Sequence, residues 1–285
     1  MAIDYDTVLN WPFEDIVQTY TERDSMLYAL GLGLGVNQTD AAELRFVYED
    51  ALQVFPTMPV VLGHPGPWMV DPRVGVNMVK VLHAEQHVEI HKPLPPAGTI
   101  VAKNRVQEVI DKGGEKGALI VTERKIYDRD SDDCYCTQKS VAFARGDGGF
   151  GGPVTTSDKP LPIPERDPDF TVDIPVSTQA ALLYRLSGDY NPLHADPAIA
   201  QKAGFERPIL HGLASYGVAA RALLVALNIE DPAALKSFGL RFSAPVFPGE
   251  VISTSIWEEA GRFAFRSRVN TRDTVVLNNG SAEFH

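Results

Sequence analysis

The most restrictive stretch of this 285-residue chain runs from Leu210 to Leu227, LHGLASYGVAARALLVAL. A helix over this segment would be apolar on almost all sides, so it has to be buried. Runs such as GTIVAKNRVQEVID and EVISTSIWEEA carry β-branched residues with partial alternation, which is typical of strands. We therefore expect an α+β fold in which a curled antiparallel sheet wraps around a central helix.

The chain also repeats itself. LYALG near Tyr28 is similar to LYRLSG near Tyr184, PVVLG to PILHG, and KPLPPAGTI to APVFPGEVI, in the same order and at nearly constant separation. Phrases repeated in this way indicate an internal duplication, and chance similarity of short apolar phrases is the alternative. We expect two related halves.

A connector separates these halves. We assign residues 1–145 to the first half, residues 146–170 to the connector and residues 171–285 to the second half. The connector, GDGGFGGPVTTSDKPLPIPERDPDF, is rich in Gly, Pro and charge and has no apolar periodicity. GDGGFGG has the composition of a phosphate-binding loop, but Pro153 and polar residues follow where such a loop requires a helix. We expect a linker here.

Polar side chains gather in the segment YRLSGDYNPLHADPAIAQKAGFERPILHG. Asp189, Asn191 and His194 fall within six residues, beside a glycine and a proline that restrict the backbone. Gly212 opens the apolar segment, where its N–H can meet a developing oxyanion. An acid, an imidazole and an N–H donor suit proton chemistry next to a carbonyl. The alternative is an ordinary Asp-x-Asn-Pro turn beside a buried histidine.

SGDYNPLH followed by AGFERPILHG closely resembles the signature of the R-specific 2-enoyl-CoA hydratases, the MaoC-like or hydratase 2 family. The likeness is strongest to the hydratase unit of the peroxisomal multifunctional enzyme type two. The resemblance implies a double hotdog fold: two antiparallel sheets, each wrapped around a central helix and packed as a pseudo-dimer. The first half reads LGLGLGVNQTD after Tyr28, without an acid–amide–histidine cluster, so we expect one active site and a first half that shapes the substrate pocket.

The same resemblance assigns roles to residues outside this cluster. Glu49, in ELRFVYED, falls on an acid needed for activity in the duplicated hydratases, and a surface acid is its plain alternative. The expected substrate-binding residues are His83, Ala84, Lys112, Tyr190 and Phe242. Two positions depart from the family pattern: Ala84 stands where the family has glycine, and Ala244 stands where close relatives have lysine.

The resemblance implies reversible hydration of trans-2-enoyl-CoA to (3R)-3-hydroxyacyl-CoA, in fatty-acid metabolism such as β-oxidation or in related acyl-CoA metabolism. Asp189 and His194 would hold the water, Asn191 would orient it, and Gly212 would stabilise the enolate. Two alternatives remain open: a hotdog acyl-CoA thioesterase and a non-catalytic acyl-CoA-binding subunit. No cofactor is expected, since coenzyme A is part of the substrate.

Charge and composition restrict the partners. A net charge of −11 argues against nucleic acid, although a few local basic side chains suffice to hold the phosphates of coenzyme A. In LHAEQHVEIHKPL, His83, His87 and His91 are spaced by four residues, so on a strand they would share one face and could suit a metal. We expect a solvated polar face and no metal.

The ends of the sequence set our expectation for location. MAIDYDTVLNWPFEDI has neither a basic n-region nor a long apolar run, and AEFH is not a peroxisomal tripeptide. We therefore expect a cytoplasmic protein without a membrane span, and a homodimer.

Overall fold

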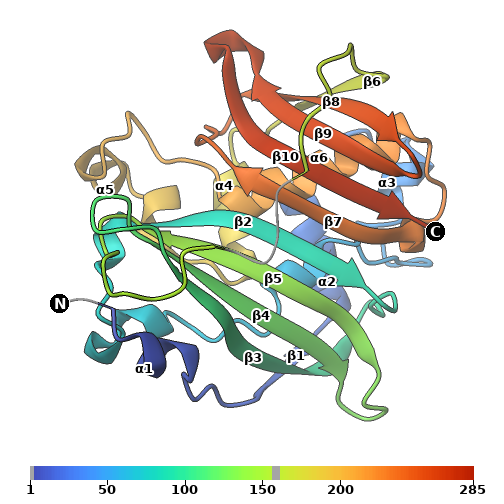
Figure 1. Cartoon of the computed structure of the whole chain (residues 1–285). Helices are drawn as coiled ribbons and strands as arrows, with labels where there is room; N and C mark the ends of the chain where they lie inside the picture. The colour runs from blue at the N-terminus through green and yellow to red at the C-terminus, as the bar shows by residue number, and fades with distance from the viewer. Residues whose placement is uncertain (1–2, 156–160) are drawn as a thin grey trace.

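The computed structural model describes residues 3–155 and 161–285. Their ten strands form one antiparallel sheet, in the order β1-β3-β4-β5-β2-β7-β10-β9-β8-β6 (Figure 1). The first-half strands are β1 (Ile16–Tyr20), β2 (Val81–Ile90), β3 (Gly98–Asp111), β4 (Ala118–Asp128) and β5 (Cys134–Ala144). The second-half strands are β6 (Phe170–Pro175), β7 (Leu235–Phe242), β8 (Val251–Glu259), β9 (Arg262–Val269) and β10 (Thr274–Phe284).

Counted from its outer edge, each half has the same strand order: β1-β3-β4-β5-β2 in the first half and β6-β8-β9-β10-β7 in the second. This symmetry is what an internal duplication produces. The halves meet where β2 pairs with β7, with Glu85 opposite Arg241 and His87 opposite Gly239. The expectation of two separate sheets therefore needs a correction. The outermost strand of each half would expose unpaired backbone groups, and pairing the two edges satisfies them.

The α-helices are α1 (Tyr5–Leu9), α2 (Glu22–Gly31), α3 (Ala41–Leu44), α4 (Ala180–Tyr184), α5 (Pro197–Lys202) and α6 (Gly212–Ala226). The expected buried helix is α6, which lies against the second-half sheet and contacts β6, β7 and β8 (Figure 1). Small residues let neighbours approach it closely: a Cβ on Gly217 would lie 2.5 Å from Cδ2 of Leu32. None of the described helices has the length and apolar character that a membrane crossing requires.

The first half has no counterpart of α6, so the expectation of a central helix in each half is wrong for this half. After Gly63 the chain forms only short 3₁₀ turns, at Trp68–Val70, Pro72–Val74 and Met78–Lys80. The sequence GHPGPWMVDPRVG explains this, because its closely spaced prolines interrupt any helix.

Side chains of the first-half sheet bond the backbone just before this irregular segment, in the 3₁₀ turn Met58–Val61 and at the next two residues. Gln18 accepts a hydrogen bond from Gly63 N at 2.7 Å, and Asn104 donates to Gly63 O at 3.4 Å. Arg124 donates to Leu62 O at 2.8 Å. From β5, buried Gln138 donates to Pro59 O at 2.7 Å. A helix bonds its own backbone, whereas an irregular segment against a sheet needs such partners.

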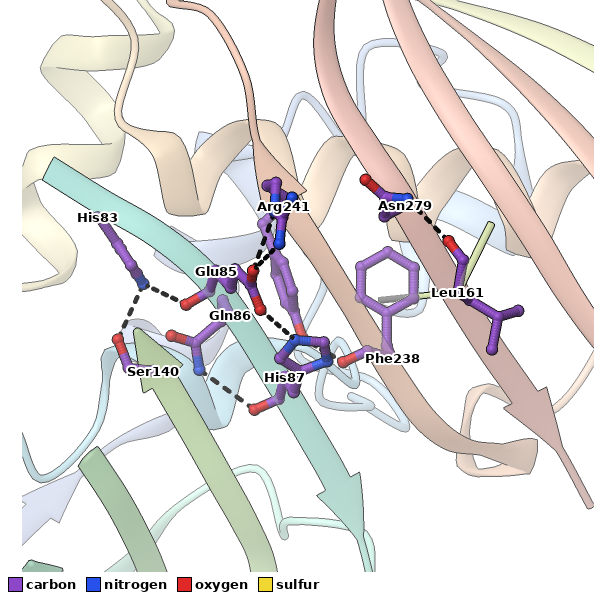
Figure 2. A network of polar contacts seen from close by, with 10 residues as sticks. His83, Glu85, Gln86, His87, Ser140, Leu161, Phe238, Arg241 and Asn279 are labelled. Atoms are coloured by element: carbon purple, nitrogen blue, oxygen red, sulfur yellow. Dashed lines mark hydrogen bonds and ion pairs between the residues drawn. The ribbon is translucent and has the colours of Figure 1, made fainter. Parts of the chain in front are cut away.

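The glycine-rich start of the connector surrounds a carboxylate. Asp111, at the end of β3, accepts hydrogen bonds from Gly113 N at 2.8 Å, Gly149 N at 2.7 Å and Gly151 N at 2.8 Å. These bonds lower the pKa of the Asp111 carboxyl. The N–H groups that a phosphate would need are therefore already engaged. Further along, Asn279 of β10 donates to Leu161 O at 2.8 Å (Figure 2). The proposed half boundaries stay a prediction, and residues 156–160 of the connector lie outside the described residues.

Candidate active site

A short, internally bonded loop carries the predicted acid, amide and imidazole. Gly188 ends the preceding turn with φ +117°, a conformation that favours glycine. Asp189 Oδ1 then accepts a hydrogen bond from Asn191 N at 3.1 Å. Asn191 Oδ1 accepts from Leu193 N at 3.0 Å and caps the 3₁₀ turn Pro192–His194. The Asn191 side chain therefore shapes the loop through its oxygen and leaves its NH₂ group as a donor.

The imidazole of His194 is buried, with 8% of its surface exposed. Its Nδ1 lies 2.9 Å from Ile209 O, so Nδ1 carries the proton and donates, while Nε2 is an acceptor. Desolvation lowers the pKa of His194, against the raising effects of the Ile209 bond and the Asp189 charge. At neutral pH this residue is thus an uncharged hydrogen-bond acceptor.

A second imidazole, which the sequence reasoning did not include in the site, stacks on the first. The His211 and His194 rings lie 3.7 Å apart between centroids. His211 is 1% exposed, and its Nε2 donates to Asp189 O at 3.1 Å. Burial, and then the neighbouring His194, lower the pKa of His211 to about 4. Its place directly before Gly212 was the sequence signal that could have identified it.

Asp189, His194 and His211 offer ligand atoms that all lie within 4.8 Å of one another. This is the one such group among the described residues. The spacing would allow them to hold a metal ion or a water molecule. Asp189 is exposed whereas both imidazoles are buried, so the space between them can be reached from solvent.

An aromatic column from both halves supports the imidazole pair. The His211 ring lies 5.2 Å from Tyr184, and Tyr184 lies 5.7 Å from Tyr28 of the first half. Tyr28 in turn shares a 2.8 Å hydrogen bond with Thr57. Tyr184, Tyr28 and Thr57 are each at most 1% exposed. Such a column restricts the motion of His211, and through it the loop carbonyl of Asp189.

Three more predicted residues come together at the start of α6. Gly212 begins α6, so its N–H belongs to the turn that has no intrahelical acceptor. A Cβ at Gly212 would lie 3.3 Å from the Phe242 ring, and that ring lies 4.8 Å from His83 of β2. His83 Nε2 is 2.9 Å from Ser140 Oγ and 3.1 Å from Glu85 O (Figure 2). Desolvation lowers the pKa of His83 to about 4, although its side chain remains exposed.

Other predicted residues are not brought to this cluster. Ala84 sits at a bulge of β2 and packs against the buried cluster of Ile110, Val121 and Val141. Tyr190 is 58% exposed, with Arg185 4.9 Å from its ring centroid.

Lys112 is exposed at the end of β3, which the pairing of β3 through β4 and β5 places at the same end of the sheet as the start of β2. Three strand spacings separate it from β2, about 14 Å. This is too far for contact with His83, but a long ligand such as an acyl-CoA could extend toward it.

Glu49 is exposed in the turn after Phe46, and no described hydrogen bond or ion pair joins it to the Asp189 loop. The acid that reaches the second half from this region is Glu43, which forms a largely buried ion pair with Arg221 of α6. Glu43 also accepts a hydrogen bond from Gly35 N at 2.9 Å. The nomination of Glu49 stays a prediction, without support from a contact.

The histidines that could have suited a metal have separate partners. His83 and His87 lie in β2, and His91 directly follows it. His87 pairs with Glu85 at 3.5 Å, and Glu85 also pairs with Arg241 across the junction of the halves at 2.6 Å (Figure 2). His91 bonds Thr137 at 2.9 Å. Within the described part of the chain they form no candidate metal group.

His64 is a further titratable side chain that the sequence reasoning did not single out. It follows the segment held by Gln18, Asn104 and Arg124. Its pKa is lowered to about 4 by desolvation and by Arg124, and is raised by Asp189. Asp189 is therefore within electrostatic reach of this first-half side chain.

A separate apolar cavity of about 250 Å³ lies at the other end of β2. Its lining includes Leu52, Phe55, Ile90, Leu94 and Pro232. None of the residues around Asp189 lines it.

The whole chain is similar to known proteins. A family model described as the MFE-2 hydratase 2 N-terminal domain matches residues 18–146, and one described as the MaoC like domain matches residues 160–279. The chain is 40% identical to a protein of Mycobacterium tuberculosis named enoyl-CoA hydratase ChsH3, over 98% of each chain. It is 37% identical to a protein of Arabidopsis thaliana named enoyl-CoA hydratase 2, peroxisomal, over 95% of this chain and 93% of that one.

A solved structure agrees with these sequences. The crystal structure of a MaoC-like dehydratase from Phytophthora capsici superposes with a TM-score of 0.87 at 39% identity, and covers 98% of each chain. The expected double hotdog architecture is thus confirmed, with the two corrections given above.

Proposed function

Because the chain belongs to the MaoC-like hydratase 2 family, we propose that it catalyses the R-specific hydration of trans-2-enoyl-CoA to (3R)-3-hydroxyacyl-CoA. The observation that carries this proposal is the grouping of Asp189, His194 and His211 within 4.8 Å, next to the N-terminus of α6. An acid, an uncharged imidazole and a free N–H donor are the groups that such an addition requires.

We assign the roles of the two groups that hold the water from the tautomer of His194. His194 Nδ1–H is engaged with Ile209 O, so Nε2 accepts one hydrogen bond from the water. The Asp189 carboxylate accepts the other. Asp189 takes a proton as the water oxygen bonds to C3, and a proton from Asp189 is delivered to C2. His194 polarises the water without exchanging its own proton, since its pKa is lowered.

The thioester oxygen gains negative charge as the C2=C3 electron pair moves toward C2 and the carbonyl. The Gly212 N–H meets this oxygen at the start of α6, where the helix dipole favours negative charge. Proton delivery to C2 then restores the carbonyl. The loop of Asp189 and the N–H of Gly212 together set which face of the enoyl group the water attacks.

We assign the remaining binding roles on the same basis. Phe242 and His83 contact each other beside Gly212 and line the path of the thioester. Lys112 would meet the coenzyme A portion, and Tyr190 would border the entrance. Asn191 would orient the water through its NH₂ group. No cofactor is required for this chemistry. The cytoplasmic location and the homodimer stay predictions, which cell fractionation and light scattering can test.

Turnover of crotonyl-CoA tests the proposal directly. Loss of the enoyl absorbance with formation of 3-hydroxybutyryl-CoA is the expected result. Oxidation of the product by a strictly R-specific, and not by an S-specific, 3-hydroxyacyl-CoA dehydrogenase would establish the stereochemistry. Release of free thiol without hydration would instead favour a thioesterase, and binding without turnover would favour an acyl-CoA-binding subunit.

A further inference from the structure

The first-half sheet carries a row of basic residues at the end where β2 begins. Four strands are neighbours there, in the order β2, β5, β4 and β3 (Figure 1). The last residues that pair across them are Val81, Ala144, Ala118 and Asp111. Lys80 directly precedes β2, Arg145 directly follows β5 and Lys112 directly follows β3. The strand spacing places neighbouring ends about 5 Å apart, so this basic row is about 14 Å long.

Backbone contacts fix the residues of the basic row next to one another. The Arg145 N–H donates to Lys80 O at 3.3 Å, and the Lys112 N–H donates to Gly117 O at 2.9 Å. A Cβ on Gly146 would lie 3.4 Å from Lys80 Nζ, so the ammonium lies across the end of β5. All three basic residues are exposed. No described hydrogen bond or ion pair joins their side-chain cations to another of residues 3–155 and 161–285.

The acids near the basic row have other partners or a cation of their own. The Asp111 carboxylate accepts hydrogen bonds from three glycine N–H groups, and Asp147 accepts one from Asn77 N at 3.0 Å. Glu115 is exposed in the turn between β3 and β4, where Lys116 follows it. In a chain with a net charge of −11, cations gathered in this way make a local site for an anion.

Strand β2 connects the basic row with the thioester end of the site. His83 lies three residues after Lys80, about 10 Å along the strand. The His83 ring is 4.8 Å from Phe242, and a Cβ on Gly212 would lie 3.3 Å from that ring. In coenzyme A, about thirteen bonds separate the thioester sulfur from the nearest phosphate, about 15 Å on the scale of an extended chain. A thioester held at Gly212 therefore has this phosphate within reach of the basic row.

Resting on the proposed hydration, we propose that Lys80 and Arg145 bind the phosphate of coenzyme A that ends the pantetheine arm. Their backbones are bonded to each other, so both cations can approach one phosphate from adjacent strand ends. The Arg145 guanidinium offers several N–H donors in one plane, and the Lys80 ammonium adds a point charge. Lys112, which is predicted to meet coenzyme A, lies further along the row and would meet the part of the carrier beyond this phosphate.

The test compares the crotonyl thioesters of 4′-phosphopantetheine and of pantetheine, which differ only in that phosphate. For the unmodified protein we expect KM to be about fivefold to tenfold lower with the phosphorylated thioester at low salt. Replacing both Lys80 and Arg145 by Ala should reduce this preference to about twofold or less. Lys80→Arg keeps the charge and should retain most of the preference. Lys103→Ala, which removes an exposed charge from the middle of β3, is the matched control and should leave it unchanged.

A preference that survives in the double variant, or an equal rise in KM for both thioesters, overturns the inference. Hydration of both thioesters without any preference refutes the role of the basic row and leaves the proposed function intact. A protein that hydrates neither these thioesters nor crotonyl-CoA refutes the proposed function. Titration calorimetry with coenzyme A itself then still tests the row: the double variant should bind it about tenfold more weakly than the Lys103→Ala control, and equal affinities overturn the inference.

Discussion

The two halves of the sheet share one strand order and differ in what covers their inner face. In the second half, α6 satisfies its own backbone, and its buried residues join an apolar cluster with Ile252 and Phe265. In the first half, the 3₁₀ turn Met58–Val61 and the next two residues are bonded by side chains of the sheet, Gln18, Asn104, Arg124 and Gln138. The stretch without a helix thus begins from a backbone held by polar side chains, where the second half has the N-terminus of α6.

This difference between the halves also gives them different chemical roles. The N-terminus of α6 supplies the Gly212 N–H, which an irregular segment cannot replace with an equivalent dipole. The first half instead supplies the imidazole of His83 and the aromatic support of Tyr28. The predictions below test how complete this separation is.

The largest effect is expected at the second-half loop. Asp189→Asn keeps the shape but cannot take up the proton, and His194→Gln replaces the ring that bonds Ile209 O through one atom and accepts from the water through another, so kcat for crotonyl-CoA should fall by roughly a hundredfold or more. Circular dichroism and butyryl-CoA binding should remain close to those of the unmodified protein. Losses below tenfold with both variants would remove the basis for placing catalysis in this half.

A second prediction isolates the N–H of α6. Gly212→Pro removes the donor at the first helical position, where proline is tolerated, and the preceding residue, at φ −58° and ψ 137°, already suits a following proline. We expect kcat to fall about a hundredfold. Gly212→Ala keeps the N–H and is the matched control, with a smaller loss from its contact with Phe242. Equal losses in both variants would point to sterics rather than to the donor.

The stacked imidazoles predict a pH dependence of stability. The folded pKa of His211, about 4, lies below the ordinary histidine value, so the unfolded chain binds the proton first as the pH falls. The contribution of His211 to the free energy of unfolding is complete above about pH 6.5 and is lost as the pH drops toward 4, on the order of 3 kcal/mol. Urea unfolding at several pH values measures this loss. His211→Gln should flatten the profile, whereas replacement of the exposed His91 by Gln should not.

A fourth prediction concerns the polar residues under the irregular segment. Gln138→Leu removes one of the two donors to the carbonyl of Pro59, which keeps the Leu62 N–H at 3.1 Å, and should lower the free energy of unfolding by about 1 kcal/mol. Because Gln138 makes none of the described hydrogen bonds with Asp189, His194 or His211, kcat should change little. Gln107→Leu on the same sheet is a comparison variant, since its buried Oε1 has no partner to lose. A Gln138 variant as stable as the unmodified protein would contradict the proposed exchange of helix for polar partners.

The smallest effect is expected at Lys112. Lys112→Ala removes an exposed charge next to the end of β3, about 14 Å from β2, and should raise KM by about twofold to fivefold at low salt, and less at high salt. Lys116→Ala, in the neighbouring turn, controls for net charge. Equal effects of both variants would mean that the local charge matters rather than a specific contact with coenzyme A.

Much of this molecule could be read from local patterns. The buried helix after Gly212 follows from its apolar residues, and the capped turn at Asp189 follows from Asx–Pro chemistry; both depend on residues close in the chain. The missing helix of the first half was also visible in the prolines after His64, although the repeat suggested otherwise.

What the sequence alone determined is therefore the duplication, the family and the second-half groups to which we assign the chemistry, because each is a short-range pattern. Only the tertiary structure decided that the halves join into one sheet, that His211 stacks on His194, and that Tyr28 packs on Tyr184. These relations join residues far apart in the chain. Their cause is physical: edge strands need partners, and an irregular backbone needs side-chain donors and acceptors.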